Sequence, residues 1–482
     1  MITAERRTLG LLAVALLALG CGGKQGNLDI QLVTSASDDP FAEAAAIRLR
    51  FGDPPLAEQT VPVAGGQFAK LSVELKPKSG TALVAPVIVE LLDGQGQVVG
   101  RGRSPQLALL PAEEALVVYV GRVGRFAVAR ASFGLPRVGA AVAPVPRLGL
   151  VSVGGSSGGK AQPAIELYSA YGHVVGNDAS LPRVGQLPSP RSGAVSLGFD
   201  RADQPSGAAL IVGGAGDDGA LAAEVLLFDA RSAGPTVYGV VSPVRSDPST
   251  ARREASAGLL PDGSFLLSGG LGADGKPLAT ATVVAAAPQI TVTPGAAAMA
   301  TPRRGHTATP IQLAAGGALL LFGGDTAGAA AETYLAGPRT FTPRDLAQPS
   351  RSGHGAVSLP DGRALVVGGR TAQRAALADG FVVAPDLRVT PLPSLLSAPR
   401  ADAAVAIAGG DVLICGGSDE RGLALASCDV VDAAQLTRRR TIPLGTPRRR
   451  ASLTTIDGGY LVLTGGVGPD DKAVGSIEIY VP

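Results

Sequence analysis

A pair of adjacent glycines follows a short apolar strand seven times in this 482-residue chain. The stretch "ALVVGG" from Ala364 is typical, and the copies recur at intervals of 45 to 59 residues. The pairs are Gly154 and Gly155, Gly213 and Gly214, Gly269 and Gly270, Gly323 and Gly324, Gly368 and Gly369, Gly416 and Gly417, and Gly465 and Gly466. Repeats of this length are supersecondary units that bury their apolar faces against neighbouring copies. The pattern therefore predicts a fold built from seven similar units.

Each unit carries the same signals in the same order. An arginine precedes the glycine pair by 16 to 22 residues, at Arg137, Arg191, Arg252, Arg303, Arg351, Arg400 and Arg448. A strand of small residues follows most of these arginines, and turn pairs such as Asp361-Gly362 favour a tight hairpin into the apolar strand. A third strand such as "AIELYSA" from Ala164 and a weaker fourth come next. The expected unit is four antiparallel strands.

The apolar strand and its glycines have a physical explanation. A continuous apolar run is typical of a strand that is buried on both faces. The glycines allow a sharp bend or positive φ, because no Cβ clashes there. The Ala-rich first strands fit a crowded position near a central axis.

These signals resemble the kelch repeat of β-propellers, the family of the kelch-domain proteins and galactose oxidase. Glu166 with Tyr168 and Glu478 with Tyr480 match that family's later-strand signature, whereas its usual Trp is absent. The resemblance implies an all-β fold, with a seven-bladed kelch-type β-propeller over residues 123–482. Because the chain ends after a third strand, we expect Phe126 to Ala131 to supply the last unit's fourth strand.

Residues 27–122 lack the repeat and read as alternating strands between turns. Their spacing predicts a small immunoglobulin-like β-sandwich that holds the propeller away from a membrane. A carbohydrate-binding role for this module remains an alternative.

The N-terminus has the features of an export signal. Residues 1–20 contain Arg6 and Arg7 and then an apolar run too short for a stable membrane span. This run ends at Cys21, and it resembles a lipobox, which implies lipidation of Cys21, with residues 21–26 as a flexible tether. We expect a lipid anchor in the bacterial outer membrane; a plain secretory signal is the alternative.

Few residues suggest chemistry. Cys415 and Cys428 lie on neighbouring strands of an exported protein, so we expect a disulfide. His306 and His354 occupy equivalent repeat positions, and His173 lies out of phase with both. The resembled family often has a histidine at that position in a structural site, so the resemblance implies a structural role for His306 and His354 rather than metal binding. The net charge of +2 gives no preference for nucleic acid.

The charged repeat positions leave two interpretations open. The seven arginines either anchor neighbouring units through backbone carbonyls or form an anion-binding rim at one mouth of the channel. Acidic residues in the loops after the glycines are expected to be solvated turn residues without calcium-loop spacing: Asp217, Asp218, Asp274, Asp419, Glu420, Asp470 and Asp471.

Taken together, we expect a non-catalytic scaffold that binds a protein or glycan partner and needs no cofactor. The alternative is a sugar-modifying enzyme, because some exported bacterial kelch propellers resemble sialic acid mutarotases. Such an enzyme would need an acid and a base at the channel mouth, and the sequence does not identify that pair.

Overall fold

The computed structural model describes residues 12–17, 26–63, 70–75, 83–109, 116–169, 174–175, 185–200, 207–229, 239–286, 289–295, 298–324 and 330–482. These residues form an all-β protein with two short 3₁₀ helices, η1 (Pro40–Glu43) and η2 (Pro248–Thr250). Within these ranges, no helix has both the length and the apolar character needed to cross a membrane.

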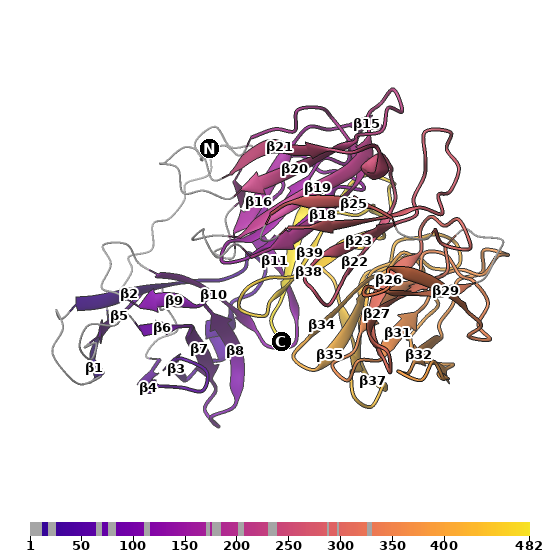
Figure 1. The fold of residues 1–482 in the computed structure, drawn as a ribbon. Coiled ribbons are helices and arrows are strands. Elements are labelled where there is room, and N and C mark those ends of the chain that lie inside the picture. Colours follow the sequence, from indigo (N-terminus) through magenta and orange to yellow (C-terminus); the bar gives the residue numbers. More distant parts are fainter. Residues whose placement is uncertain are drawn as a thin grey trace.

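Most of the chain forms seven four-stranded antiparallel sheets, numbered here in chain order (Figure 1). Sheet 1 contains β12 (Ala141–Val145), β13 (Gly149–Val153), β16 (Ile165–Ser169) and β17 (Val174–Val175). Sheet 2 contains β18 (Ser192–Phe199), β19 (Ala208–Ala215), β20 (Glu224–Asp229) and β21 (Val240–Ser246). Sheet 3 contains β22 (Ser256–Leu259), β23 (Phe265–Ser268), β24 (Ala281–Ala285) and β25 (Thr291–Pro294). Sheet 4 contains β26 (Thr307–Leu313), β27 (Gly316–Phe322), β28 (Ala331–Leu335) and β29 (Thr340–Arg344).

The remaining sheets repeat this order. Sheet 5 contains β30 (Gly355–Ser358), β31 (Ala364–Val367), β32 (Gly380–Val383) and β33 (Val389–Leu392). Sheet 6 contains β34 (Ala404–Ala408), β35 (Asp411–Cys415), β36 (Ser427–Asp432) and β37 (Arg438–Pro443). Sheet 7 contains β38 (Ser452–Thr455), β39 (Leu461–Thr464), β40 (Ser476–Tyr480) and β11 (Phe126–Ser132). A two-stranded ribbon, β14 (Ser156–Ser157) and β15 (Lys160–Ala161), extends from sheet 1.

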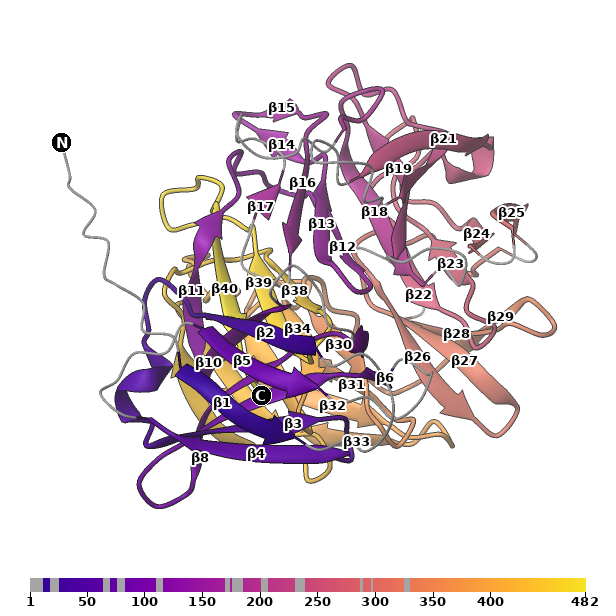
Figure 2. The same ribbon diagram turned by 90° about the vertical axis from the view of Figure 1, so that its left-hand side faces the viewer.

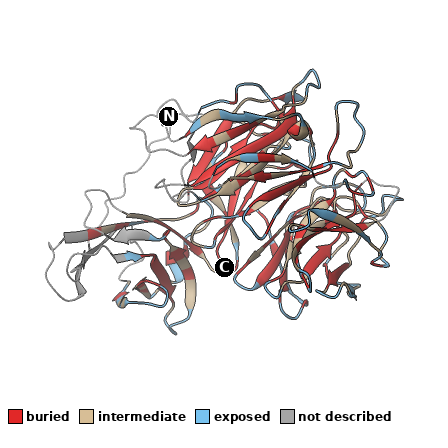
Figure 3. Ribbon diagram, viewed as in Figure 1, coloured by how far each residue is buried: buried red, intermediate tan, exposed pale blue. Residues whose placement is uncertain are grey.

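The seven sheets pack face to face in a closed ring, an arrangement consistent with a β-propeller (Figure 2). Each consecutive pair of sheets shares one apolar core. A further core joins sheet 7 to sheet 1, with Val462 and Ile479 packed near Leu150 and Tyr168. The second strand of each sheet is almost wholly buried, because it lies between two neighbouring sheets (Figure 3).

Sheet 7 is completed by two distant parts of the chain. β11 pairs antiparallel with β40, with Phe126 opposite Tyr480 and Val128 opposite Glu478. The last unit thus takes its fourth strand from the segment that precedes the first unit. This pairing is the one predicted from the sequence, and it leaves no unpaired β40 edge.

The N-terminal strands form one continuous mixed sheet of eight strands in the order β1-β5-β2-β10-β8-β7-β3-β4. Its strands are β1 (Leu12–Leu17), β2 (Gly26–Val33), β3 (Ala46–Phe51), β4 (Ala57–Pro62), β5 (Lys70–Leu75), β7 (Val87–Leu92), β8 (Val98–Arg103) and β10 (Leu116–Arg122). A separate pair contains β6 (Leu83–Ala85) and β9 (Leu107–Leu109). The sheet encloses one core that includes Ile30, Leu49 and Val89.

Two sequence-based predictions concern the beginning of this module. β1 lies inside the expected export signal, so cleavage before Cys21 would leave β5 as the edge strand. Cys21 itself, and with it the expected lipidation and most of the tether, lies outside the described residues.

The N-terminal module contacts the ring at sheet 7. The Tyr460 hydroxyl donates a hydrogen bond of 2.8 Å to the carbonyl of Tyr119 and accepts one from the amide of Arg103. The rings of Tyr119 and Tyr460 pack edge to face, with centroids 5.6 Å apart. In addition, the amide of Ala36 donates to the carbonyl of Val128 in β11.

Candidate functional site at the diglycine end of the ring

Each sheet has one end where its first strand begins and its second strand ends at the glycine pair; we call this the diglycine end. The repeat arginine, the glycine pair and the loop to the third strand all lie at this end. The opposite end carries the hairpins between first and second strands, including the Asp457–Tyr460 loop that faces the N-terminal module.

The seven repeat arginines lie inside the sheets and are only 0 to 4% exposed. Every guanidinium donates to the carbonyl of the first glycine of its own unit, over distances of 2.8 to 3.4 Å. Burial lowers the pKa of most of these arginines, and for Arg252 the value falls to about 10. Of the two interpretations left open by the sequence, this burial favours structural anchoring through backbone carbonyls over an anion-binding rim.

Six of the arginines also pair with a carboxylate on the third strand or, in the case of Asp379, directly before it. The pairs are Arg137–Glu166, Arg191–Glu224, Arg303–Glu332, Arg351–Asp379, Arg400–Asp429 and Arg448–Glu478, with N···O distances of 2.7 to 3.0 Å. In sheet 3 the corresponding group is Thr280, whose hydroxyl accepts from Arg252 at 3.1 Å. The matching carboxylates could have been found by aligning the third strands of the units, since Glu332-x-Tyr334 repeats the signature of Glu166 and Glu478.

The glycine pairs join neighbouring sheets. Both glycines of every pair have positive φ, between 57° and 93°. In six units the second glycine donates its N–H to the carbonyl of the next unit's arginine, at 2.8 to 3.0 Å. A Cβ on the first glycine of these units would lie only 2.3 to 2.5 Å from that carbonyl oxygen, so no other residue fits. We call the hydrogen bond from the N–H of the second glycine to the carbonyl of the next unit's arginine the junction bond.

His306 and His354 are buried structural residues of these junctions. Nε2 of His306 lies 2.9 Å from the hydroxyl of Ser268 in the preceding sheet, and Nε2 of His354 lies 3.0 Å from that of Thr307. Burial lowers the pKa of His306 to about 3 and that of His354 to about 4, and nearby arginines add to both effects. Both imidazoles are therefore neutral at physiological pH. His173 lies outside the described residues.

The predicted disulfide between Cys415 and Cys428 is present, on directly opposed residues of β35 and β36. The acidic loop residues serve mainly as turn acceptors: the carboxylate of Asp419, for example, accepts from the amides of Arg421 and Leu423. In the part of the chain that the structure describes, no group of three His, Cys, Asp or Glu side chains is arranged to hold a metal ion.

A ring of residues with positive φ surrounds the mouth at the diglycine end. They lie two positions after the repeat arginines, with φ between 55° and 67°: Gly139, Gly193, Glu254, Gly305, Gly353, Asp402 and Arg450. We call them the mouth residues. Four are glycines, which adopt this conformation without strain, and three carry charged side chains. This pattern could have been found by aligning the units, although the sequence analysis did not single it out.

The charged mouth residues form ion pairs across neighbouring sheets. Nη1 of Arg304 lies 3.8 Å from Glu254, and Nε of Arg450 lies 3.7 Å from Asp402. The side chains of Glu254 and Arg450 are more than half exposed, so these pairs are accessible to a partner. The backbone beneath them is tied together, because the amide of Arg450 donates to the carbonyl of Asp402 at 2.9 Å.

Comparison with known proteins does not assign the chain to a family. No protein-family model matches it, and no curated protein does. The solved structure described as "Structure of YjhT" aligns with 63% of this chain and 98% of its own, with 13% sequence identity and a TM-score of 0.46. That similarity is too low to support a conclusion about activity.

Proposed function

We propose that this protein is an envelope-tethered, seven-bladed propeller of kelch type, and that it binds a protein or glycan partner through the mouth residues without catalysing a reaction. In this proposal the N-terminal module is an immunoglobulin-like spacer, and a lipid on Cys21 supplies the anchor.

The proposal rests chiefly on the three charged mouth residues. A residue other than glycine at positive φ costs on the order of 1 kcal/mol or more. This conformational cost applies to Glu254, Asp402 and Arg450, whereas the other four units have glycine at the same position. Strain of this kind gathers at functional sites, where a side chain is needed in spite of it.

The position of the N-terminal module supports the same interpretation. Its contacts with sheet 7 involve Tyr460 and Pro482, which lie at the opposite end of the ring. Other contacts of the module run along the edge strand β11, from Ala36 to Val128 and from Arg130 to Thr34, and none of the contacts between described residues of the module and the ring involves a mouth residue. A tether that begins in this module would hold the mouth residues away from the membrane surface.

The test compares binding by matched glycine variants of the full chain. Glu254→Gly and Arg450→Gly remove mouth side chains, whereas Arg339→Gly removes an exposed arginine with φ of 54° from the loop between β28 and β29. Each protein is applied to a glycan array and to fractionated envelope proteins. We expect a defined ligand whose affinity drops at least about tenfold in the two mouth variants and is unchanged in Arg339→Gly.

Two results would contradict the proposal. One is equal binding by all four proteins, which would place the partner surface elsewhere. The other is catalysis of sugar mutarotation by the wild-type chain that is lost in the mouth variants, because this would establish the enzymatic alternative.

A further inference from the structure

The junction between sheets 7 and 1 differs from the other six. The junction bond from the second glycine to the next arginine carbonyl occurs at all the others, but none joins the described residues Gly466 and Arg137. A Cβ on Gly465 would lie 3.7 Å from the carbonyl oxygen of Arg137, compared with 2.3 to 2.5 Å at the other six junctions. The glycine pair therefore lies more than 1 Å further from the next arginine carbonyl here than at the other six junctions.

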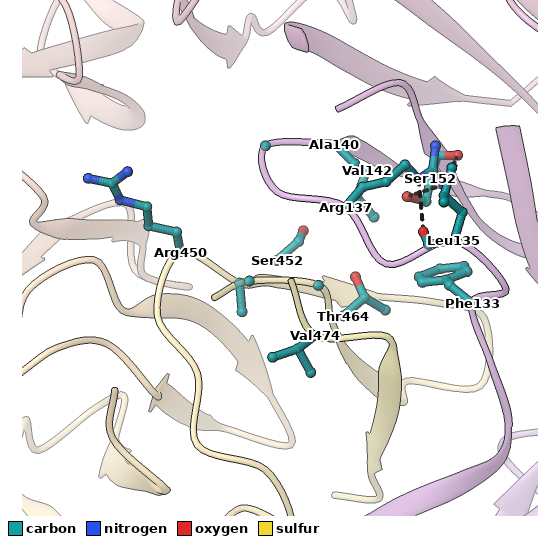
Figure 4. A pocket seen from close by; sticks show the side chains of 14 residues that line it. Phe133, Leu135, Arg137, Ala140, Val142, Ser152, Arg450, Ser452, Thr464 and Val474 are labelled. Atoms are coloured by element: carbon teal, nitrogen blue, oxygen red, sulfur yellow. Dashed lines mark hydrogen bonds between the residues drawn. The ribbon is translucent and has the colours of Figure 1, made fainter. Parts of the chain in front are cut away.

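This separation leaves a cavity of about 160 Å³ between the two sheets (Figure 4). Its apolar wall includes Ala140 and Val142 on the sheet 1 side, and Val474 and Phe133, which directly follows β11, on the sheet 7 side. A cavity of about this volume holds one six-membered ring. Gly466, whose N–H donates to no backbone carbonyl in the described part of the chain, and Arg137 both line it.

One buried hydroxyl at the cavity has no hydrogen-bond partner among the residues that the structure describes. Thr464 lines the cavity and is 1% exposed, and its Oγ1 bonds to no other described residue. Other polar groups there are already paired: the Ser152 hydroxyl with Arg137, and the Ser452 hydroxyl with Thr454. A buried hydroxyl without a partner costs about 1–3 kcal/mol, so it favours a ligand that can bond to it.

The junction between sheets 3 and 4 shows what such a hydroxyl contacts when its partner is present. There Ser268, which occupies the repeat position of Thr464, bonds to the imidazole of His306. The position of His306 is occupied by Ala140 at the junction of sheets 7 and 1, since each lies three residues after its repeat arginine. The cavity thus lies at the position that the neutral imidazole of His306 occupies at the junction of sheets 3 and 4, whereas four other units also have alanine there: Ala194, Ala255, Ala403 and Ala451.

The charges around the cavity argue for an uncharged ligand. The guanidinium of Arg137 is paired with Glu166 at 2.7 Å. Arg450 points away from Thr464 and Ser452 in Figure 4, and its Nε faces Asp402. Neither cation is directed into the cavity without a counter-charge.

We infer that the junction of sheets 7 and 1 is a binding site for a small uncharged ring that carries a hydrogen-bond donor and an acceptor. The ring packs against Phe133 and Val142, and its polar atoms bond to Thr464 Oγ1, the Gly466 N–H or the Arg137 carbonyl. Occupancy bridges the first and last sheets, so the ligand stabilises ring closure. This inference does not depend on the proposed partner-binding function.

The test uses imidazole and phenol as probes at pH 8, where imidazole is neutral, with benzene as the ring that cannot hydrogen-bond. The thermal unfolding temperature of the full chain is measured against probe concentration. Because binding only to the folded state stabilises it, we expect a saturable rise with half-saturation at about 0.1–10 mM for imidazole and phenol. Benzene should bind more weakly.

Two variants separate this site from general solvent effects. Ala140→His places an imidazole where His306 stands at the other junction, so it should raise the unfolding temperature and abolish the response to the probes. Thr464→Val removes the hydroxyl and should weaken binding at least about fivefold, whereas Thr309→Val, a buried threonine of sheet 4, should leave it unchanged.

The inference is overturned if the unfolding temperature does not respond saturably to either polar probe. It is also overturned if Ala140→His responds as the wild type does. If Ala140→His does not fold, the threonine pair decides: equal probe affinity in Thr464→Val and Thr309→Val refutes the site.

Discussion

The guanidinium of Arg448 and the carboxylate of Glu478 lie 2.8 Å apart, and both side chains are completely buried in sheet 7. The same carboxylate accepts from the amides of Gly445 and Thr446. One ion pair thus links the loop before the first strand, the glycine carbonyl after the second strand and the third strand. Its repetition around the ring explains how a protein without Trp and with few aromatic residues fixes its loops.

Breaking this pair should be more harmful than removing an arginine that has no carboxylate partner. Arg448→Met leaves Glu478 charged and buried, so we expect a loss of about 3–5 kcal/mol in the free energy of unfolding. Arg252→Met leaves mainly carbonyls unpaired and should cost about 1–3 kcal/mol. Urea unfolding of the two variants checks this difference, and equal losses would show that the carboxylate is not the decisive partner.

The two buried histidines should make the ring sensitive to mild acid. Burial lowers the pKa of His306 to about 3 and that of His354 to about 4, whereas in the unfolded chain each is near 6.5. Below about pH 6.5 the unfolded state therefore binds protons that the folded state does not. Stability should be fully present above pH 6.5 and should fall by up to about 1.4 kcal/mol per pH unit for each histidine as the pH decreases toward 4.

A double variant, His306→Gln with His354→Gln, tests this assignment. It should be less stable than the wild type at pH 8, because two buried hydrogen bonds change, but its stability should vary much less between pH 6.5 and 5. The measurement is chemical denaturation at several pH values. An unchanged slope in the variant would assign the acid sensitivity to other groups.

Closure by β11 predicts a position-specific effect of proline. The amide of Val128 points toward Ser37, so the amide of the neighbouring Ala127 points toward β40. Ala127→Pro should remove a ladder hydrogen bond, leave its acceptor unpaired and lower the free energy of unfolding by about 1–3 kcal/mol. Ala127→Gly keeps the amide and should cost only about 0.5–1 kcal/mol. Similar unfolding midpoints for the two variants would count against closure through this strand.

The strained mouth residues predict a gain in stability on substitution by glycine. Arg450 has φ of 55° and only a largely exposed ion pair with Asp402. Arg450→Gly should therefore raise the free energy of unfolding by about 0.5–1 kcal/mol, after the larger entropy of glycine in the unfolded chain is subtracted. Arg339→Gly, at the opposite end of the ring, should gain a similar amount. A loss of stability in Arg450→Gly alone would mean that its side chain holds sheet 7 in place.

The sequence predicted the features that depend on local pattern. Glycine pairs after apolar strands marked each unit, the strand from Phe126 completed the last one, and the spacing of Cys415 and Cys428 matched two neighbouring strands. These features follow from the order of apolar and polar residues along the chain and from its turn residues. They can therefore be predicted without knowing the distances between sheets. The arginines were identified in the same way, but the sequence left two roles open for them, and only their burial favours internal anchoring over a rim.

What only the tertiary structure decided is how well each sheet fits the next. The glycine pair at Gly465 and Gly466 has the same sequence signals as the other six, yet its junction is wider and contains a cavity. The reason is physical: six junctions join units that follow one another in the chain, whereas the seventh joins the two ends of the repeat region. Its width is set by the accumulated geometry of the whole ring, and no local sequence pattern specifies that quantity.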